Sequence, residues 1–460
     1  MQTGTALNRD RMLGEEKIGR LLARLAIPAI IGTLVFSLYN LVDTIFVGQG
    51  IGALAIGALA VVFPLQTLLM AAGAMLGIGA ASVISRNLGA GNREQAYMAA
   101  GNALVFAAIL GLAILIPCEI FIYQVLNLFG ATGELLSYAY DYLVIILWGS
   151  VFTTFALAGN SIIRSEGRAA AAMLSLMLGT GLNIPLDYLL IFVFDMGIRG
   201  AALATVIAQS CSFLYVLFFF ITGRSSLKIT FRHLIPNLKI IREILVLGIP
   251  VFIRQGAKSV LFIIVNNSLK YYGNAMSIPV FGIIFRLFAF LLLPAMGIGE
   301  GFQPIAGFNY GAKQYDRVRE AVWKAVTAAS VLAIAAFTAI MLFPEFLIGL
   351  FSNDARLIKE AVSALRLFML AVPLVGLQII GSLYFFAIGK ALPALLLGLS
   401  RQVLLLIPFV LILPIFWKIT GIWGAFPLAD IFSTGITGFW LMRELILKKK
   451  EAVHAPLPVS

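Results

Sequence analysis

Residues 25–48 read LAIPAIIGTLVFSLYNLVDTIFVG, and Asp43 is their only acidic or basic residue. A helix needs roughly 20 mainly apolar residues to cross the hydrocarbon core of a bilayer, so this stretch is long enough to span it. It is too long for a strand of a membrane barrel, and it lacks the alternation of apolar and polar residues that such strands show. The stretch therefore predicts a membrane-spanning helix.

The rest of the chain has the same character. Of its 460 residues, 61% are hydrophobic and 12% are charged, and the mean hydropathy is +1.00. Soluble proteins have about 25% charged residues. The sequence thus predicts an all-α membrane protein with about 12 transmembrane helices. The expected spans are 26–48, 54–84, 97–117, 138–162, 171–194, 201–222, 244–266, 276–306, 322–343, 361–387, 392–416 and 421–442.

The distribution of basic residues orients these spans. Lys and Arg concentrate in the N-terminal segment, in the even-numbered loops and in the C-terminal tail. The richest loop is the sixth, with Arg224, Lys228, Arg232, Lys239 and Arg242. Cytoplasmic loops carry such an excess, so both termini are expected in the cytoplasm and the chain in the plasma membrane. This pattern also explains the net charge of +12, so no nucleic-acid partner is expected.

An internal repeat organises the chain into halves. The segment LAIPAIIG places Pro28 opposite Pro250 of LGIPVFIR, an offset of 250 − 28 = 222. The same offset pairs Gly89 of NLGAGNREQA with Gly311 of NYGAKQYDRV. Near the end, GIRGAALA matches GIWGAFPL at an offset of 224. Most of these matches lie in loops, where a general likeness among apolar helices cannot explain them.

Each half has about six spans, and an even number returns each half to the side on which it began. The two six-helix bundles should therefore be related by a pseudo-two-fold axis along the membrane normal, a common plan in transporters. The expected parts are an N-terminal lobe at 1–222, a cytoplasmic linker at 223–243, a C-terminal lobe at 244–445 and a disordered cytoplasmic tail at 446–460.

Ionisable side chains within spans are costly and mark functional sites. In the first half the acids within spans are Asp43 in the first span, Asp187 in the fifth, and Asp141, which stands near the start of the fourth span, where water is expected to reach it. Asn183 precedes Asp187 by four residues and shares its helix face, and Thr205 in the sixth span can add an oxygen. Carboxylate, amide and hydroxyl oxygens suit a proton or a hard cation such as Na⁺. The alternative is that the two acids are separate helix-end residues in contact with water.

The second half does not keep these acids. At offset 222, Val265 stands opposite Asp43 and Phe409 opposite Asp187, so packing of the repeat does not require the carboxylates. This half instead offers a polar network of either structural or functional role: Arg254, Lys258, Arg286, Glu300 and Arg401.

Other chemistry finds little support in the sequence. Cys118 and Cys211 lie in apolar stretches, His233 and His454 lie in a loop and the tail, and no nucleophile or nucleotide-binding motif appears. The chain is therefore predicted to be no enzyme and to need no cofactor beyond a coupling ion. Pro28 can kink the first helix and act as a hinge. The alternative is that it has no such role, because a proline is common where a helix enters the membrane.

The segments LAIPAIIGTLVFSLYNLVDTIFVG, GIGAASVISRNLGAGN, SIIRSEGRAAAAM, LNIPLDYLLIF and GIRGAALATVIAQ resemble the MATE (multidrug and toxic compound extrusion) family, over about residues 17 to 445. The resemblance implies antiport of organic cations against Na⁺ or H⁺ by alternating access. It is strongest to the branch with its cation site in the N-terminal lobe. The residues it implies are Asp43, Asn183, Asp187 and Thr205 for the ion, Pro28 for bending, and Tyr39, Asn40 and Tyr142 for the cavity wall.

Two functions remain open at this point. The leading hypothesis is a monomeric secondary transporter that exports amphipathic organic cations through a membrane-embedded cavity. The alternative is a lipid-linked precursor flippase of the same broad group, in which basic residues of the second lobe attract a pyrophosphate head group. A receptor or scaffold is disfavoured, because no soluble sensory domain or long loop is present.

Overall fold

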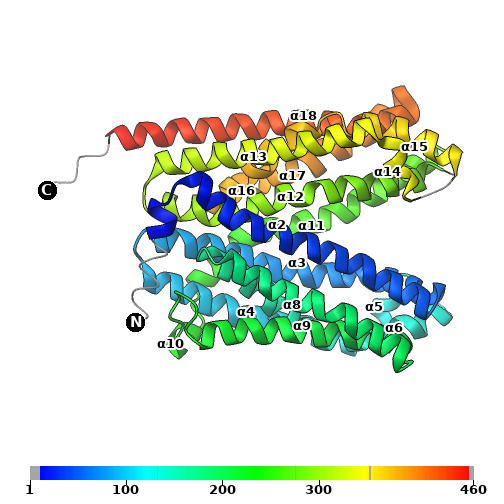
Figure 1. Ribbon diagram of the computed structural model, residues 1–460, viewed down its shortest axis with the longest axis horizontal. Coiled ribbons are helices and arrows are strands. Elements are labelled where there is room, and N and C mark those ends of the chain that lie inside the picture. Colours follow the sequence, from blue (N-terminus) through cyan, green and yellow to red (C-terminus); the bar gives the residue numbers. More distant parts are fainter. Residues whose placement is uncertain (1–10, 132, 275, 352–353, 455–460) are drawn as a thin grey trace. The chain divides into compact units, whose positions relative to one another are not determined.

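The computed structural model describes residues 11–131, 133–274, 276–351 and 354–454, and every regular element in them is a helix (Figure 1). The first part of the chain forms α2 (Ile18–Gly50), α3 (Ala53–Gly89), α4 (Arg93–Ile120), α5 (Ile122–Leu128), α6 (Glu134–Trp148), α7 (Ser150–Ser165), α8 (Ala169–Asp187), η1 (Tyr188–Val193), α9 (Gly197–Ile221) and α10 (Phe231–Leu234). The second part forms α11 (Leu238–Tyr272), α12 (Ser277–Gly311), α13 (Tyr315–Leu342), α14 (Pro344–Gly349), α15 (Ala355–Phe368), η2 (Val372–Leu374), α16 (Val375–Ala387), α17 (Ala391–Leu399), η3 (Ser400–Leu406) and α18 (Ile407–His454).

The expected number of spans is confirmed. In the described residues, nine helical runs are long and apolar enough to cross a membrane, and two bent pairs, α6 with α7 (51°) and α15 with α16 (41°), pass together. One of the nine, Ala391–Leu447, has 57 residues and breaks at Lys418, where φ is 48°. At a rise of about 1.5 Å per residue it is far longer than one crossing, so it holds two spans. The total is twelve.

The repeat is visible in the helix boundaries. Helices α3 and α12 end at Gly89 and Gly311, α4 and α13 begin at Arg93 and Tyr315, and α8 and α17 begin 222 residues apart. The two halves thus fold alike, as the sequence matches predicted.

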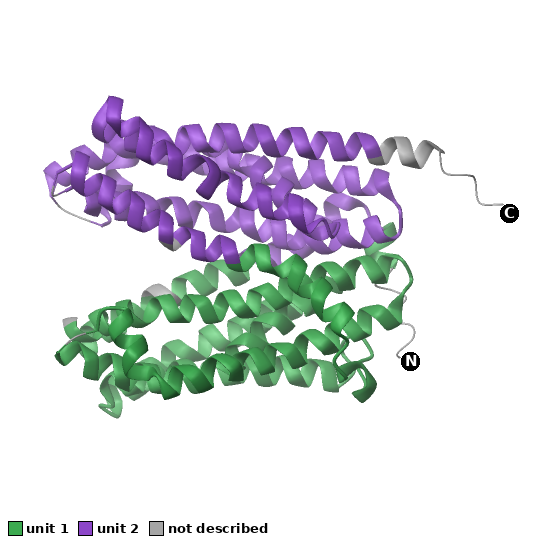
Figure 2. Ribbon diagram, turned by 180° about the vertical axis from the view of Figure 1, so that it is seen from behind, with its two compact units in different colours: residues 1–15, 31–252 green, residues 16–30, 253–460 purple. Residues whose placement is uncertain are grey.

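Two compact units divide the chain (Figure 2): residues 1–15 with 31–252, and residues 16–30 with 253–460. We call them the first and second units. The boundary therefore falls inside α2 and inside α11, two residues after Pro28 and two after Pro250. The two boundaries lie at equivalent positions of the repeat, since 30 + 222 = 252. The start of α2 belongs to the second unit, and the start of α11 to the first, whereas the sequence had suggested that each lobe keeps its first helix whole.

Close helix crossings fix these helix starts. In the first unit, a Cβ at Gly248 of α11 would overlap the carbonyl oxygen of Met75 on α3. In the second unit, a Cβ at Gly301 of α12 would lie 2.6 Å from the backbone nitrogen of Ala26 on α2. Small residues at such crossings let helix backbones approach closely in a membrane.

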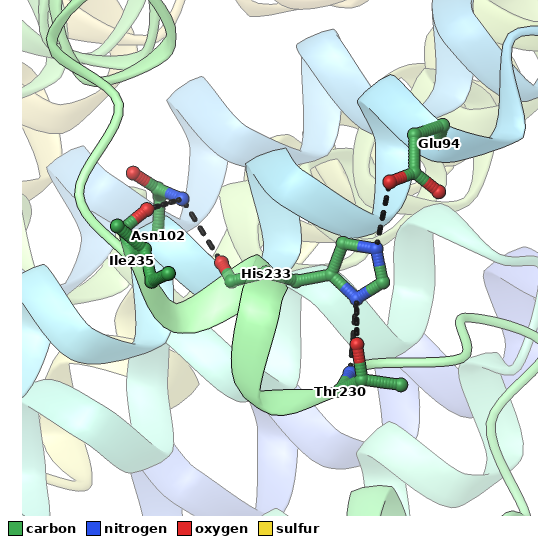
Figure 3. Close-up of polar contacts among 5 residues, drawn as sticks. All are labelled: Glu94, Asn102, Thr230, His233 and Ile235. Carbon is green, nitrogen blue, oxygen red and sulfur yellow. Dashed lines mark hydrogen bonds and ion pairs between the residues drawn. The ribbon is translucent and has the colours of Figure 1, made fainter.

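The expected linker at 223–243 contains α10 and the beginning of α11, and it is held on α4 (Figure 3). The side chain of Asn102 donates to the carbonyl oxygens of His233 (3.0 Å) and Ile235 (3.2 Å). The Nδ1 of His233 accepts from the backbone N–H of Thr230 (2.9 Å), while its Nε2 lies 3.2 Å from Glu94. The linker is thus an ordered part of the first unit.

A buried glutamate holds the beginning of this linker. Glu166 follows α7, is 1% exposed and accepts hydrogen bonds from Ser225 and Ser226. Burial raises the pKa of Glu166 above its usual value, and these hydrogen bonds act against that rise. At the other end of the chain, α18 continues to His454, so the segment expected to be disordered from 446 begins as helix.

Candidate functional site

The two acids of the first unit stand where their helices meet. Asp43 lies well inside α2, and Asp187 is the last residue of α8. The chain then changes to the wider π-helical turn η1, which frequently accompanies functional sites. Asn183 stands one turn before Asp187, and Thr205 lies on the neighbouring helix α9.

These residues form one cluster. The carboxyl groups of Asp43 and Asp187 are in hydrogen-bonding contact, and one oxygen of each is buried without a partner. Asn183 fits its neighbours when its nitrogen donates to Oδ2 of Asp187 (2.6 Å) and its oxygen accepts from the backbone N–H of Thr205 (3.2 Å). Asp187 is fully buried, so a charge there has no water to stabilise it.

The cluster opens on a cavity of about 220 Å³ within the first unit. Its wall is mainly apolar and aromatic, with Phe36, Tyr39, Phe63 and Tyr142 among the lining residues. Asp43 is the acidic residue of that wall, and Asn183 and Thr205 also line it. The arrangement is a mainly apolar chamber with a carboxylate at one side.

A family comparison decides the assignment. The MatE family model matches residues 28–189 and 250–412, once in each half of the chain. This chain belongs to the MatE family. The two matched segments begin 222 residues apart, at the two equivalent prolines, so the family model describes one repeat of the MatE fold.

Named MatE relatives cover most of the chain. The multidrug export protein MepA of Staphylococcus aureus is 27% identical over 397 residues, which are 86% of this chain and 87% of that protein. MepA of Staphylococcus haemolyticus is 27% identical over 408 residues, with 89% and 90% coverage. A crystal structure of MATE in the bent conformation matches with a TM-score of 0.91 and 28% identity, and the match covers 97% of this chain and 99% of that one.

Several residues of the MatE cavity were not predicted from the sequence. Gln66 donates to the hydroxyl of Tyr142 (3.2 Å), and Thr153 donates to the side-chain oxygen of Gln209 (2.6 Å). All four line the cavity. The sequence did offer a sign of Gln66 and Gln209, because each is an uncharged amide within an apolar span. An amide indicates a functional site less strongly than a carboxylate does.

The remaining residues expected at the first-unit site are placed as follows. Tyr39 lines the cavity and is within hydrogen-bonding reach of Thr205. Pro28 lies inside α2, close to the boundary between the units. Asn40 lies in α2, but its side chain is outside the described residues.

The oxygen atoms of this cluster are of the kind that binds a coupling ion. No group of three or more His, Cys, Asp or Glu side chains that could hold a metal occurs in the described residues. A Na⁺ ion does not need such a group, because two carboxylates, an amide and a hydroxyl are all oxygen ligands of the hard type. The unpartnered oxygens of Asp43 and Asp187 fit either that ion or a shared proton.

The polar residues expected in the second unit lie on three elements, with Arg254 and Lys258 on α11, Arg286 and Glu300 on α12, and Arg401 on η3. Arg401 pairs with Asp430, which is 1% exposed, and its guanidinium lies 4.9 Å from the centre of the Phe288 ring. Arg286 is exposed on α12.

Proposed function

We propose that this MatE transporter exports amphipathic organic cations from the cytoplasm in exchange for H⁺ or Na⁺. One observation carries the proposal. The carboxyl group of Asp43 lines an apolar cavity and touches that of Asp187 behind it, and each keeps a buried oxygen without a partner. Two carboxylates in contact cannot both stay ionised at low cost, so they need a proton or a cation between them.

This requirement couples the ion to the substrate. A cationic substrate in the cavity neutralises the carboxylate of Asp43 from the cavity side. It thereby removes the need for the proton or Na⁺, which leaves. When the substrate is released on the other side, the pair takes up an ion again. In an alternating-access cycle, each exported cation is thus exchanged for an incoming one.

The wall explains a broad choice of substrate. Aromatic faces such as those of Tyr39, Phe63 and Tyr142 attract cations and accept flat apolar groups. The amides of Gln66 and Gln209 already have partners, so they add polarity without charge. Such a cavity selects for positive charge and an apolar body rather than for one molecular shape.

The relatives agree with this class of function, since both are named multidrug export proteins. The test is transport of tetraphenylphosphonium by the purified protein in liposomes with separately imposed H⁺ and Na⁺ gradients. We expect one of the two gradients to drive export, and Asp43→Asn to abolish the gradient-dependent part.

A matched control is Asp141→Asn. This residue also lies in the first unit, but it pairs with Arg199 at 2.7 Å and is absent from the cavity wall. It should keep gradient-driven export. Full coupled export by Asp43→Asn would overturn the proposal, and so would export by the wild type that neither gradient affects.

A further inference from the structure

Two basic residues lie one helical turn apart near the middle of α11. Arg254 and Lys258 are partly buried in a helix of 35 residues with the length and hydropathy of a membrane span. Their spacing of four places both on one helix face, where like charges repel. Within the described residues, no hydrogen bond or ion pair satisfies either side chain.

The nearby acid is already occupied. The charges that act on Lys258 are the positive ones of Arg254 and Arg401. Arg401 is bound to Asp430 through two guanidinium nitrogens, so its partner is not shared with α11. The neighbourhood therefore holds an excess of positive charge inside a membrane-spanning unit, which is expensive without an anion.

The repeat shows that these positions correspond to a cavity wall. Subtracting 222, Lys258 corresponds to Phe36 and Arg401 to Gly179, and both of these line the first-unit cavity. The second unit thus has cations at positions where the first unit has a phenylalanine and a glycine.

The packing around Arg254 is also built for a large side chain. In the first unit, the equivalent Gly32 faces Leu176, which would lie 3.3 Å from a Cβ there. In the second unit the position of Leu176 is taken by Gly398, whose own Cβ would lie 3.9 Å from the Arg254 side chain. A large and a small residue have exchanged places, so the arginine has room and is not an accident of surface composition.

Aromatic side chains follow the basic pair along α11. Phe262 lies one further turn along the same face of α11, and its ring centre is 4.5 Å from that of Phe285 on α12. Phe262 and Phe285 are partly buried against the core of the second unit, so this face of α11 passes from two cations to aromatic rings.

We propose that Arg254 and Lys258 form a binding site for the anionic head of an amphipathic molecule, of the phosphate monoester class. Arg binds phosphate oxygens through paired N–H groups and Lys adds a point charge, so the pair suits this head group. The site is distinct from the acidic cluster of the first unit. It would let the protein bind lipid-like anions as well as organic cations.

Binding of dodecyl phosphate to the purified full-length protein tests this, with dodecyltrimethylammonium as a probe of equal chain length and opposite charge. We expect the double variant Arg254→Gln/Lys258→Gln to weaken dodecyl phosphate binding at least tenfold and to leave dodecyltrimethylammonium binding unchanged. Inorganic phosphate should bind much more weakly than dodecyl phosphate, because it lacks the tail.

The matched control is Arg286→Gln, which removes one exposed positive charge from α12 and should not change binding. Equal loss in this control would mean general charge attraction and would overturn the proposal, as would undiminished dodecyl phosphate binding by the double variant. Equal affinity for inorganic phosphate would overturn the amphipathic assignment.

Stability gives a second readout that does not depend on a ligand. If the two cations are unpaired, the double variant should unfold at the same temperature as the wild type or higher. A clear fall in that temperature would mean that the pair is a structural element, and would overturn the proposal. These binding and unfolding measurements do not require transport. A negative result would therefore overturn the anion site without bearing on the proposed coupling at Asp43 and Asp187.

Discussion

The carboxyl group of Asp43 on α2 is in hydrogen-bonding contact with that of Asp187 at the end of α8. The contact joins the first and fifth spans of the first half. Because each carboxyl also has a buried oxygen without a partner, the contact is complete only with a proton or a cation. The equivalents Val265 and Phe409 cannot make it, so the second half has no counterpart of this pair.

Asn183 should matter for stability as well as for ion binding. Its amide donates to Asp187, so Asn183→Ala leaves a buried carboxylate oxygen without its donor. A buried polar group left unpaired costs about 1–3 kcal/mol, and we expect a loss of that size in thermal or denaturant unfolding in detergent. Asn92→Ala is the control, because Asn92 is exposed and its side chain makes no capping hydrogen bond. Equal stability of the Asn183→Ala variant and the wild type would contradict the described contacts.

The crossing of α11 with α3 predicts opposite effects for two glycines of one helix. Gly248→Ala places a methyl group against the backbone of Met75 and should destabilise the protein by about 1–3 kcal/mol. Gly256→Ala meets nothing within 4 Å, so it should be neutral or stabilising by up to about 1 kcal/mol, since alanine favours helix. Unfolding temperatures of the two variants check this. A similar effect of both would show that the helices do not approach as closely as described.

Glu166 should make the linker sensitive to pH. Burial raises the pKa of Glu166, so the folded state holds this proton more tightly than the unfolded state. Its contribution to stability is therefore fully present below the ordinary glutamate pKa and is lost as pH rises through the raised value. Unfolding measured across this range should show that the wild type loses stability, relative to Glu166→Gln, as pH rises. A constant difference between the two proteins would argue against the raised pKa.

The sequence predicted the fold well because its signals were local. The length of the apolar stretches identified the spans. The repeat was identified by Pro28, Pro250 and the loop glycines, and the helix boundaries confirm it. The meeting of Asp43 with Asp187 could also be anticipated, because isolated carboxylates within spans have few alternatives to pairing.

Other features depend on contacts between distant segments, and the sequence did not reveal them. Residues 16–30 belong to the second unit because Gly301 lets α12 approach Ala26, and neither residue is unusual by itself. The partners of Gln66 and Gln209 were equally hidden, since an uncharged amide is cheap enough in a span to occur without a function. Asp430 as the partner of Arg401 required knowledge of how α18 packs against η3.

We propose above that the acidic pair of the first unit exchanges an ion for a cationic substrate. The most direct measurement adds tetraphenylphosphonium to the purified protein and records the release of H⁺ and of Na⁺. The account predicts release of about one ion per bound molecule from the wild type and none from Asp43→Asn, since the pair shares a single cation. Substrate binding without release from the wild type, or equal release from Asp43→Asn, would contradict it.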